Sequence, residues 1–384
     1  MSETPTLNPV RDSGKEIDSA LAVSPPRPAR RPRLALLDGL RLLAAVSVMA
    51  HHYTGANDAW DASAKELFPI LHPFTQYGWI GVEVFFLISG FVICMTAWNK
   101  GLGDFFSSRV TRLYPAYWVA LTLSVIVITI WPTVRSTSSW TDVAVNYTML
   151  QQGFGIPNVD GVYWTLFAEL KFYLAFAIVV AMGVTFRRCV LFCVFWTLAS
   201  MLAWQLSNDV LWSWVMPYYA PYFTGGIGLY LIYRFGLSAV PVGIVGVSFV
   251  LAEYSVKQRV GNLEPVVTNV DHPIAAWPAQ LIIAGTFLFM LLLALGKFNR
   301  IQWRWLTTAG ILTYPVYLLH QAIGLTVLHG LKDQLPALPL ALGVMAMMLV
   351  FAWLVHRFAE RPLARVLGRA MDRGIADLRQ HSTR

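Results

Sequence analysis

Arg41 and His52 are the first pair of residues in this sequence whose spacing suggests chemistry. They are eleven residues apart within one largely apolar stretch. In an α-helix this spacing places them within about 20° of the same face and about 16 Å apart along the axis. An imidazole can take a proton from a hydroxyl group near neutral pH, and a guanidinium can bind phosphate or polarise a carbonyl. His51 lies about 100° further around the helix, so the spacing favours His52 as a general base.

Two glutamates also stand among apolar and aromatic residues. They are Glu83, and Glu169 with Thr165 and Tyr173 four residues to either side. Residues four apart share a helix face, so this spacing predicts one polar stripe. A carboxylate in apolar surroundings is costly unless it is paired. We therefore expect Glu83 or Glu169 to orient or recharge the histidine.

Arg109 and Arg112 lie three residues apart in a short polar segment, residues 105–115, which we expect to be a cytoplasmic loop. They are either a basic flank that orients the neighbouring spans or an anion clamp, because guanidinium groups suit phosphate bidentately. His320 is a second imidazole in apolar surroundings, next to a kink expected at Pro315. No HExxH metal spacing and no Ser or Cys in a nucleophile elbow occurs. The sequence therefore predicts no metal site and favours direct transfer chemistry.

The composition shows what must position these residues. Of 384 residues, 56% are hydrophobic and only 13% are charged, whereas soluble proteins carry about 25% charged residues. This excludes a soluble enzyme, a disordered chain and a collagen-like fibre. The three cysteines lie in apolar runs, so no disulfide framework is predicted.

The apolar runs predict an all-α, polytopic membrane bundle of about ten transmembrane helices, because about 20 apolar residues cross a bilayer. The runs are continuous rather than alternating, unlike strands of a membrane barrel. The expected spans are residues 35–56, 78–98, 114–132, 161–182, 189–207, 216–234, 238–255, 274–296, 306–328 and 337–357.

Lys and Arg residues gather on one side of these spans, which places both termini in the cytoplasm and the chain in the plasma membrane. The net charge of +8 is then a topology signal with anionic lipid contacts, and nucleic acid is not an expected partner. The predicted division is a disordered basic leader (1–33), a membrane domain (34–357) and a basic cytoplasmic tail (358–384) that resembles an amphipathic helix.

These motifs occur in an order that resembles the acyltransferase 3 family of membrane O-acyltransferases, which act on polysaccharides, lipids or antibiotics. The resemblance covers about residues 34–365. The matching segments are 37–41 with His52, 81–91 with Glu83, 109–115, 164–173 with Trp164 and Tyr173, 314–320 with His320, and 360–362. Lys171 is not part of the family pattern.

The resemblance implies transfer of an acyl group, commonly acetyl, from cytoplasmic acyl-CoA to a hydroxyl of a glycan, glycolipid or secondary metabolite. His52 would be the base, with Glu83 and Glu169 beside it as catalytic residues. Arg41, Arg109 and Arg112 would bind the acyl donor. His320, Trp164 and Tyr173 are secondary candidates. Acyl-CoA would be a co-substrate, and no bound cofactor is expected.

Two other classes of function fit part of the pattern. A proton-coupled transporter or flippase of an anionic or glycan substrate would also carry intramembrane His, Glu and Arg residues. A sensor or scaffold without catalysis would leave the cost of these residues unexplained. The ordered motifs and the absence of a repeated half in the sequence favour the acyltransferase.

Overall fold

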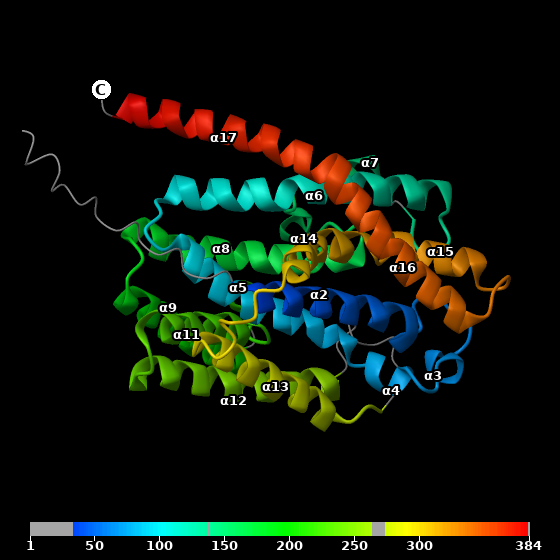
Figure 1. Cartoon of the computed structure of the whole chain (residues 1–384), viewed down its shortest axis with the longest axis horizontal. Coiled ribbons are helices and arrows are strands. Elements are labelled where there is room, and N and C mark those ends of the chain that lie inside the picture. The colour runs from blue at the N-terminus through cyan, green and yellow to red at the C-terminus, as the bar shows by residue number, and fades with distance from the viewer. Residues whose placement is uncertain (1–33, 137–138, 207, 263–272, 383–384) are drawn as a thin grey trace, which may run out of the picture. The chain divides into compact units, whose positions relative to one another are not determined.

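The computed structural model describes residues 34–136, 139–206, 208–262 and 273–382, and within these ranges the regular structure is entirely helical (Figure 1). The predicted leader, residues 1–33, lies outside them. In chain order the helices are α2 (Ala35–Ala50), η1 (His51–Gly55), α3 (Ala64–Leu67), α4 (His72–Thr75), η2 (Gly78–Ile80), α5 (Gly81–Ala97), α6 (Leu102–Ile130), α7 (Trp140–Asn146), η3 (Gln151–Phe154), η4 (Gly161–Tyr163), α8 (Trp164–Met182), α9 (Phe186–Gln205), α10 (Asp209–Val215), α11 (Ala220–Phe235), α12 (Ala239–Asn262), α13 (Ala276–Ala294), α14 (Arg304–Leu319), α15 (Ala322–Leu331), α16 (Ala337–Val355), η5 (His356–Glu360) and α17 (Arg361–Ser382).

The helices account for each predicted span and confirm the all-α membrane bundle. Within the described residues, seven helical segments are long and apolar enough to cross a bilayer, and α14 with α15 forms an eighth, bent span. The α2 and α11 helices have 16 residues each. That is short for a full crossing, and the π-helical turn η1 extends α2.

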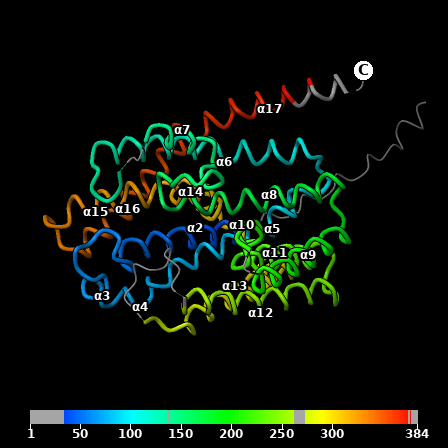
Figure 2. The backbone as a smooth tube through the Cα atoms, turned by 180° about the vertical axis from the view of Figure 1, so that it is seen from behind, coloured from blue at the N-terminus to red at the C-terminus, as the bar shows by residue number. Residues whose placement is uncertain are grey.

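The helices α2, α5 and α11 pack at the centre of this bundle (Figures 1 and 2). Small residues bring α5 and α11 almost into backbone contact. A Cβ atom at Gly90 would lie 2.1 Å from the carbonyl oxygen of Phe223, and one at Gly226 would lie 2.1 Å from that of Leu87. Glycine at both positions thus allows the close approach that is typical of membrane helix pairs. On its other side α2 packs against α14.

The segment with Arg109 and Arg112 is helical, which corrects the predicted loop. The α6 helix begins at Leu102, twelve residues before the expected span, and runs through Pro115 to Ile130. Phe105 in the first turns of α6 is buried, although these turns have a low hydropathy that is typical of a loop between two spans. This part of α6 packs against α17. Tertiary packing therefore makes a helix where hydropathy alone indicated a loop.

The ninth predicted span is broken near its middle. The α14 and α15 helices meet at a bend of 65°, which lies at His320 and Gln321, whereas Pro315 stands inside α14. Side chains from other elements satisfy the backbone at the break: Tyr53 Oη donates to the His320 carbonyl at 2.6 Å, and Asp160 Oδ2 accepts from the Ala322 N–H at 2.9 Å. The break therefore leaves no backbone group unpaired at these two positions.

The predicted tail forms the helix α17, which continues α16 through the π-helical turn η5. Arginines recur every four residues along it, at 361, 365, 369 and 373, so they share one face. That α17 lies on the cytoplasmic membrane surface stays a prediction.

Candidate functional site

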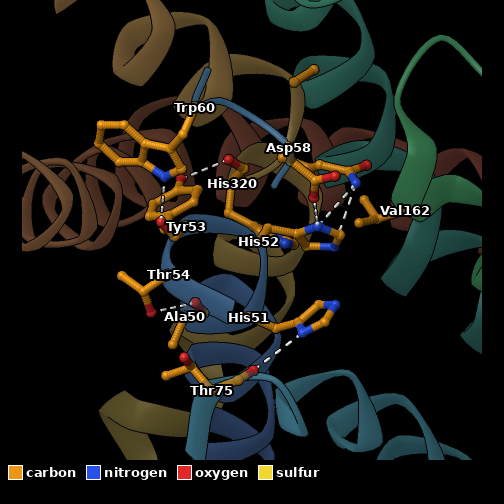
Figure 3. Close-up of polar contacts among 12 residues, drawn as sticks. Ala50, His51, His52, Tyr53, Thr54, Asp58, Trp60, Thr75, Val162 and His320 are labelled. Carbon is orange, nitrogen blue, oxygen red and sulfur yellow. Dashed lines mark hydrogen bonds and ion pairs between the residues drawn. The ribbon is translucent and has the colours of Figure 1, made fainter. Parts of the chain in front are cut away.

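His52 stands in η1, directly after α2, and its ring is held by a carboxylate that follows it closely in the chain. The distance from His52 Nδ1 to Asp58 Oδ2 is 2.6 Å, and both side chains are about 15% exposed (Figure 3). A carboxylate at Nδ1 stabilises the tautomer with the proton on Nδ1. The lone pair of Nε2 is then available to accept a proton.

The short segment that carries Asp58 is fixed at several points. Trp60 Nε1 donates to the carbonyl of Tyr53 at 2.9 Å, and the Ala64 N–H donates to Asn57 Oδ1 at 2.7 Å. Further along, Lys332 Nζ lies 2.5 Å from Asp61 Oδ1. The pKa of the Asp61 carboxyl is lowered by this hydrogen bond. These contacts fix the backbone on both sides of Asp58 and so hold its carboxylate against the imidazole of His52.

His52 opens into a cavity of about 300 Å³, which we call the histidine cavity. The polar and aromatic side chains that line it come from five elements of the chain and from the connections between them. They are His51, His52, Asp58, Trp79, Arg135, Trp164, Arg259, Tyr317 and Gln321. The predicted secondary residue Trp164 is thus in the same cavity as His52.

Two other histidines, His51 and His320, flank His52. The ring centroids of His51 and His320 lie 5.3 Å and 5.4 Å from that of His52. His51 Nδ1 is 3.1 Å from the carbonyl of Thr75, and His320 Nδ1 is 2.8 Å from that of Tyr317. A carbonyl can only accept, so both rings donate through Nδ1. His320 is fully buried and does not line the histidine cavity, whereas His51 does.

Glu83 is fully buried and forms an ion pair with Arg259, which is also buried. The Arg259 guanidinium lies over the rings of Trp79 and Tyr219, 4.7 Å and 5.0 Å from their centroids. Glu83 therefore meets the histidine cavity through Arg259, and the carboxylate that contacts His52 is Asp58. Neutralising a buried guanidinium in this way avoids the high cost of an unpaired charge.

The three predicted donor-binding arginines converge on a second cavity, the arginine cavity. Arg41, Arg109 and Arg112 line it together with Glu169 and Tyr173. With three guanidinium groups against one carboxylate, the lining is electropositive. Thr165 lies in the same wall, so the stripe of residues 165, 169 and 173 faces this cavity as its spacing indicated.

Hydrogen bonds orient two of these charged groups. Arg109 Nη2 donates to Thr96 Oγ1 at 3.2 Å, and its guanidinium lies 6.0 Å from the ring centroid of Tyr173. Glu169 Oε1 accepts from Ser89 Oγ at 2.7 Å. In contrast, Arg41 Nε is buried without a hydrogen-bond partner among the described residues. The cavity is therefore lined by a guanidinium whose Nε–H group makes no hydrogen bond to the described residues.

Val82 and Tyr317 line both cavities and so lie between them. Tyr317 is held there by its hydroxyl, which is 2.9 Å from Thr165 Oγ1. The edge of its ring packs on Phe85, with the centroids 5.5 Å apart. Val82 and Tyr317 are thus a shared wall of the arginine cavity and the histidine cavity.

A group of polar residues surrounds the start of α15 beside His52. Asp160 is fully buried and accepts from the N–H groups of Val162 and Ala322. Burial raises the pKa of the Asp160 carboxyl, and the nearby Arg135 guanidinium acts in the opposite direction. Gln321 Nε2 lies 3.3 Å and 3.4 Å from the two ring nitrogens of His52. These groups bring hydrogen-bond donors to the histidine cavity.

Gly161 makes this arrangement possible. A Cβ atom there would lie 2.3 Å from Gln321 Oε1 and 2.5 Å from Arg135 Nη2. Any larger residue would displace both side chains from the cavity. In the described part of the chain, no group of three His, Cys, Asp or Glu side chains is arranged to hold a metal ion.

Sequence reasoning did not find Asp58, Arg135, Arg259 or Gln321. Asp58 lies in a polar connection, where a carboxylate is ordinary, and its distance of six residues from His52 was the available signal. Arg135 and Arg259 stand in segments between the predicted spans, where basic residues are ordinary. Their position in the same cavity as His52 depends on packing between segments far apart in the chain. Lys171 donates to the Ser213 carbonyl at 2.6 Å and lies outside both cavities.

Comparison with known proteins identifies the family of the chain. The family model described as "Acyltransferase domain" (Acyl_transf_3) matches residues 34–357. The chain is 28% identical over 377 residues to the acyltransferase MdmB of Streptomyces mycarofaciens, with 89% of this chain and 94% of that protein covered. It is 29% identical over 158 residues to the peptidoglycan O-acetyltransferase OatA of Listeria monocytogenes, with 36% of this chain and 22% of that protein covered. No solved structure matches the chain. The match to the family model covers both cavities and every predicted site residue, and the chain belongs to the acyltransferase 3 family of membrane acyltransferases.

Proposed function

We propose that this acyltransferase moves an acyl group, in the simplest case acetyl, from acyl-CoA to a hydroxyl of a carbohydrate-type acceptor. One observation carries the proposal: the cavity of the His52–Asp58 pair shares the lining residues Val82 and Tyr317 with a cavity that holds three arginines. Acyl transfer from a phosphorylated donor needs an anion site and a base that one extended donor molecule can reach together, with its phosphates at the first and its thioester at the second.

The arginine cavity is the donor site in this proposal. Arg41, Arg109 and Arg112 would bind the phosphates of the donor, since guanidinium groups form strong charge-assisted hydrogen bonds to phosphate oxygens. The acyl end of the donor would pass Val82 and Tyr317 to reach His52. Glu169 would position the arginines from the opposite wall, with Tyr173 beside Arg109.

The histidine cavity is the acceptor site. His52 Nε2 takes the proton of the acceptor hydroxyl while the hydroxyl oxygen attacks the thioester carbon. The C–S bond then breaks, and the proton passes from the imidazolium to the leaving thiolate, which gives free CoA and the ester. Asp58 stabilises the imidazolium between these two steps. Arg135 and Gln321 offer donors to the oxyanion, and Glu83 keeps Arg259 in place.

The name of one relative supports an acceptor with hydroxyl groups, because that relative is a peptidoglycan O-acetyltransferase. The same proposal places the protein in the plasma membrane with both termini in the cytoplasm. The arginine cavity would then open toward cytoplasmic acyl-CoA, and the histidine cavity would lie nearer the outer side.

The test is thiol release from acetyl-CoA by the purified chain in proteoliposomes, with and without an extract of candidate acceptors. We expect release that depends on the acceptor extract and is lost in His52→Ala. A transporter would instead move substrate across the vesicle membrane and leave acetyl-CoA intact. Acetyl-CoA that stays intact with every acceptor fraction would contradict the proposal.

A further inference from the structure

A third cavity lies on the membrane-facing side of α8 and α9, and it has no residue in common with the two cavities of the site. Its volume is about 810 Å³ and its walls are almost entirely apolar. Ile178 and Met182 of α8 and Phe195 of α9 are 63%, 54% and 66% exposed there. In a membrane these side chains meet lipid, so we call this surface the lipid-facing groove.

The helix α10 packs against α9 and contributes to the inner part of the groove. Trp196 Nε1 of α9 donates to the carbonyl of Val215 at 2.7 Å. Lys171 Nζ of α8 donates to the carbonyl of Ser213 at 2.6 Å. Lys171 thus ties α10 to α8. Trp214 and Val215 line the inner part of the groove.

The depth of the groove matches one leaflet of a bilayer. From Arg187 to Ala199, the last residue of α9 that lines the groove, is twelve residues, or about 18 Å along the helix. Half of a hydrocarbon core is about 15 Å. A lipid chain that entered beside Arg187 would therefore end against Trp214, at the centre of the membrane.

The open end carries two arginines with different surroundings. The Arg188 guanidinium donates to the carbonyls of Met182 and Gly183 and so caps the end of α8. The Arg187 side chain is exposed and lies at the mouth of the groove. An exposed guanidinium at the end of an apolar groove complements a phosphate headgroup above an acyl chain.

We propose that the lipid-facing groove binds one anionic phospholipid from the leaflet on the Arg187 side. One acyl chain lies between α8 and α9 and ends at Trp214, and Arg187 binds the phosphate. The site is independent of acyl transfer, because neither Arg187 nor the groove walls contribute to the histidine or arginine cavity.

The experiment measures lipids retained by the purified full-length protein. The protein is delipidated in detergent, mixed with equal amounts of phosphatidylglycerol and phosphatidylcholine of the same chain length, and analysed by native mass spectrometry. We expect one phosphatidylglycerol bound in preference to phosphatidylcholine. Arg187→Gln should reduce that preference by about fivefold, which corresponds to ~1 kcal/mol for one basic residue near a lipid surface. Arg187→Lys should largely retain it.

Two further variants separate the groove from general charge effects. Arg300→Gln removes an exposed arginine at the same end of the bundle, outside the groove, and should behave like the wild type. Ile178→Trp fills the groove and should abolish retention of both lipids; if that variant does not fold, Leu191→Phe fills it from α9. Equal retention of the two lipids by the wild type, an effect of Arg300→Gln as large as that of Arg187→Gln, or unchanged retention after filling would overturn the proposal.

Discussion

A histidine acts as a base when one ring nitrogen keeps its lone pair and the other is held in place. His52 meets both conditions, since Asp58 occupies Nδ1 at 2.6 Å and the ring borders a cavity. His51, its neighbour, uses its Nδ1 to donate to a backbone carbonyl of the segment before α5. At the scale of residues, His51 and His52 therefore differ in the partner of Nδ1, which is a backbone carbonyl for His51 and a carboxylate for His52.

This difference predicts unequal effects of two alanine substitutions. His52→Ala should lower the transfer rate by about 10²–10⁴-fold, the usual contribution of a general base, without loss of protein from the membrane. His51→Ala should keep most of the activity. The measurement is the rate of transfer at matched protein amounts in isolated membranes. An essential His51 together with a dispensable His52 would show that the wrong ring has been assigned.

Asp58 provides a second prediction at this scale. Asp58→Asn keeps the size of the side chain but can no longer stabilise an imidazolium by charge, and its amide can favour the other tautomer. We expect a fall of roughly 10²-fold or more in kcat with little change in KM for the donor. Asp58→Glu should recover part of the rate. The matched control is Asp61→Asn, because Asp61 lies in the same segment and pairs with Lys332. Equal rates for the two Asn variants would remove Asp58 from the mechanism.

At the scale of elements, Arg109 and Arg112 lie on the first turns of α6 rather than on a loop. Their side chains start from one rigid face and reach the same cavity. Replacing both by Lys preserves the charge that orients a membrane helix, but it removes the planar fork that meets two phosphate oxygens. The substitution therefore separates the two interpretations of this pair.

We expect the double Arg→Lys protein to insert normally and to show a raised apparent KM for acetyl-CoA. Losing one charge-assisted hydrogen bond costs about 1.5–3 kcal/mol, or a tenfold to hundredfold weakening. Excess acetyl-CoA should restore part of the rate, which it cannot do for His52→Ala. A double-Lys protein that matched the wild type at limiting acetyl-CoA would leave these arginines with a role in topology alone.

The sequence was sufficient to predict the spans but not the local departures from regular helices. Each span is a continuous run of apolar residues, and such a run can be recognised in the sequence without knowledge of its tertiary packing. The early start of α6 was missed because its first turns are stabilised by packing against α17, which hydropathy does not report. The bend at His320 depends on Tyr53 and Asp160 from distant segments. The predicted histidine and arginines do line the cavities, but Asp58 and Arg259 required the structure.

At the scale of the whole molecule, the two cavities lie on opposite sides of Val82 and Tyr317, so their order along the membrane normal defines the direction of transfer. The positive-inside rule predicts the arginine cavity on the cytoplasmic side. Single cysteines report this directly, because the three native cysteines are buried. In intact cells, Ser139→Cys should react with an impermeant maleimide, and Arg300→Cys should react after permeabilisation. The opposite pattern would invert the proposed direction of transfer.

The central claim is that the His52–Asp58 pair transfers the acyl group of acyl-CoA to an acceptor hydroxyl. The most direct measurement supplies isotope-labelled acetyl-CoA to membranes that contain the wild type or His52→Ala, followed by mass spectrometry of the extracted glycans, glycolipids and small molecules. The account predicts one acceptor class that gains a labelled acetyl ester with the wild type and none with His52→Ala. A labelled ester formed equally by both proteins would contradict it.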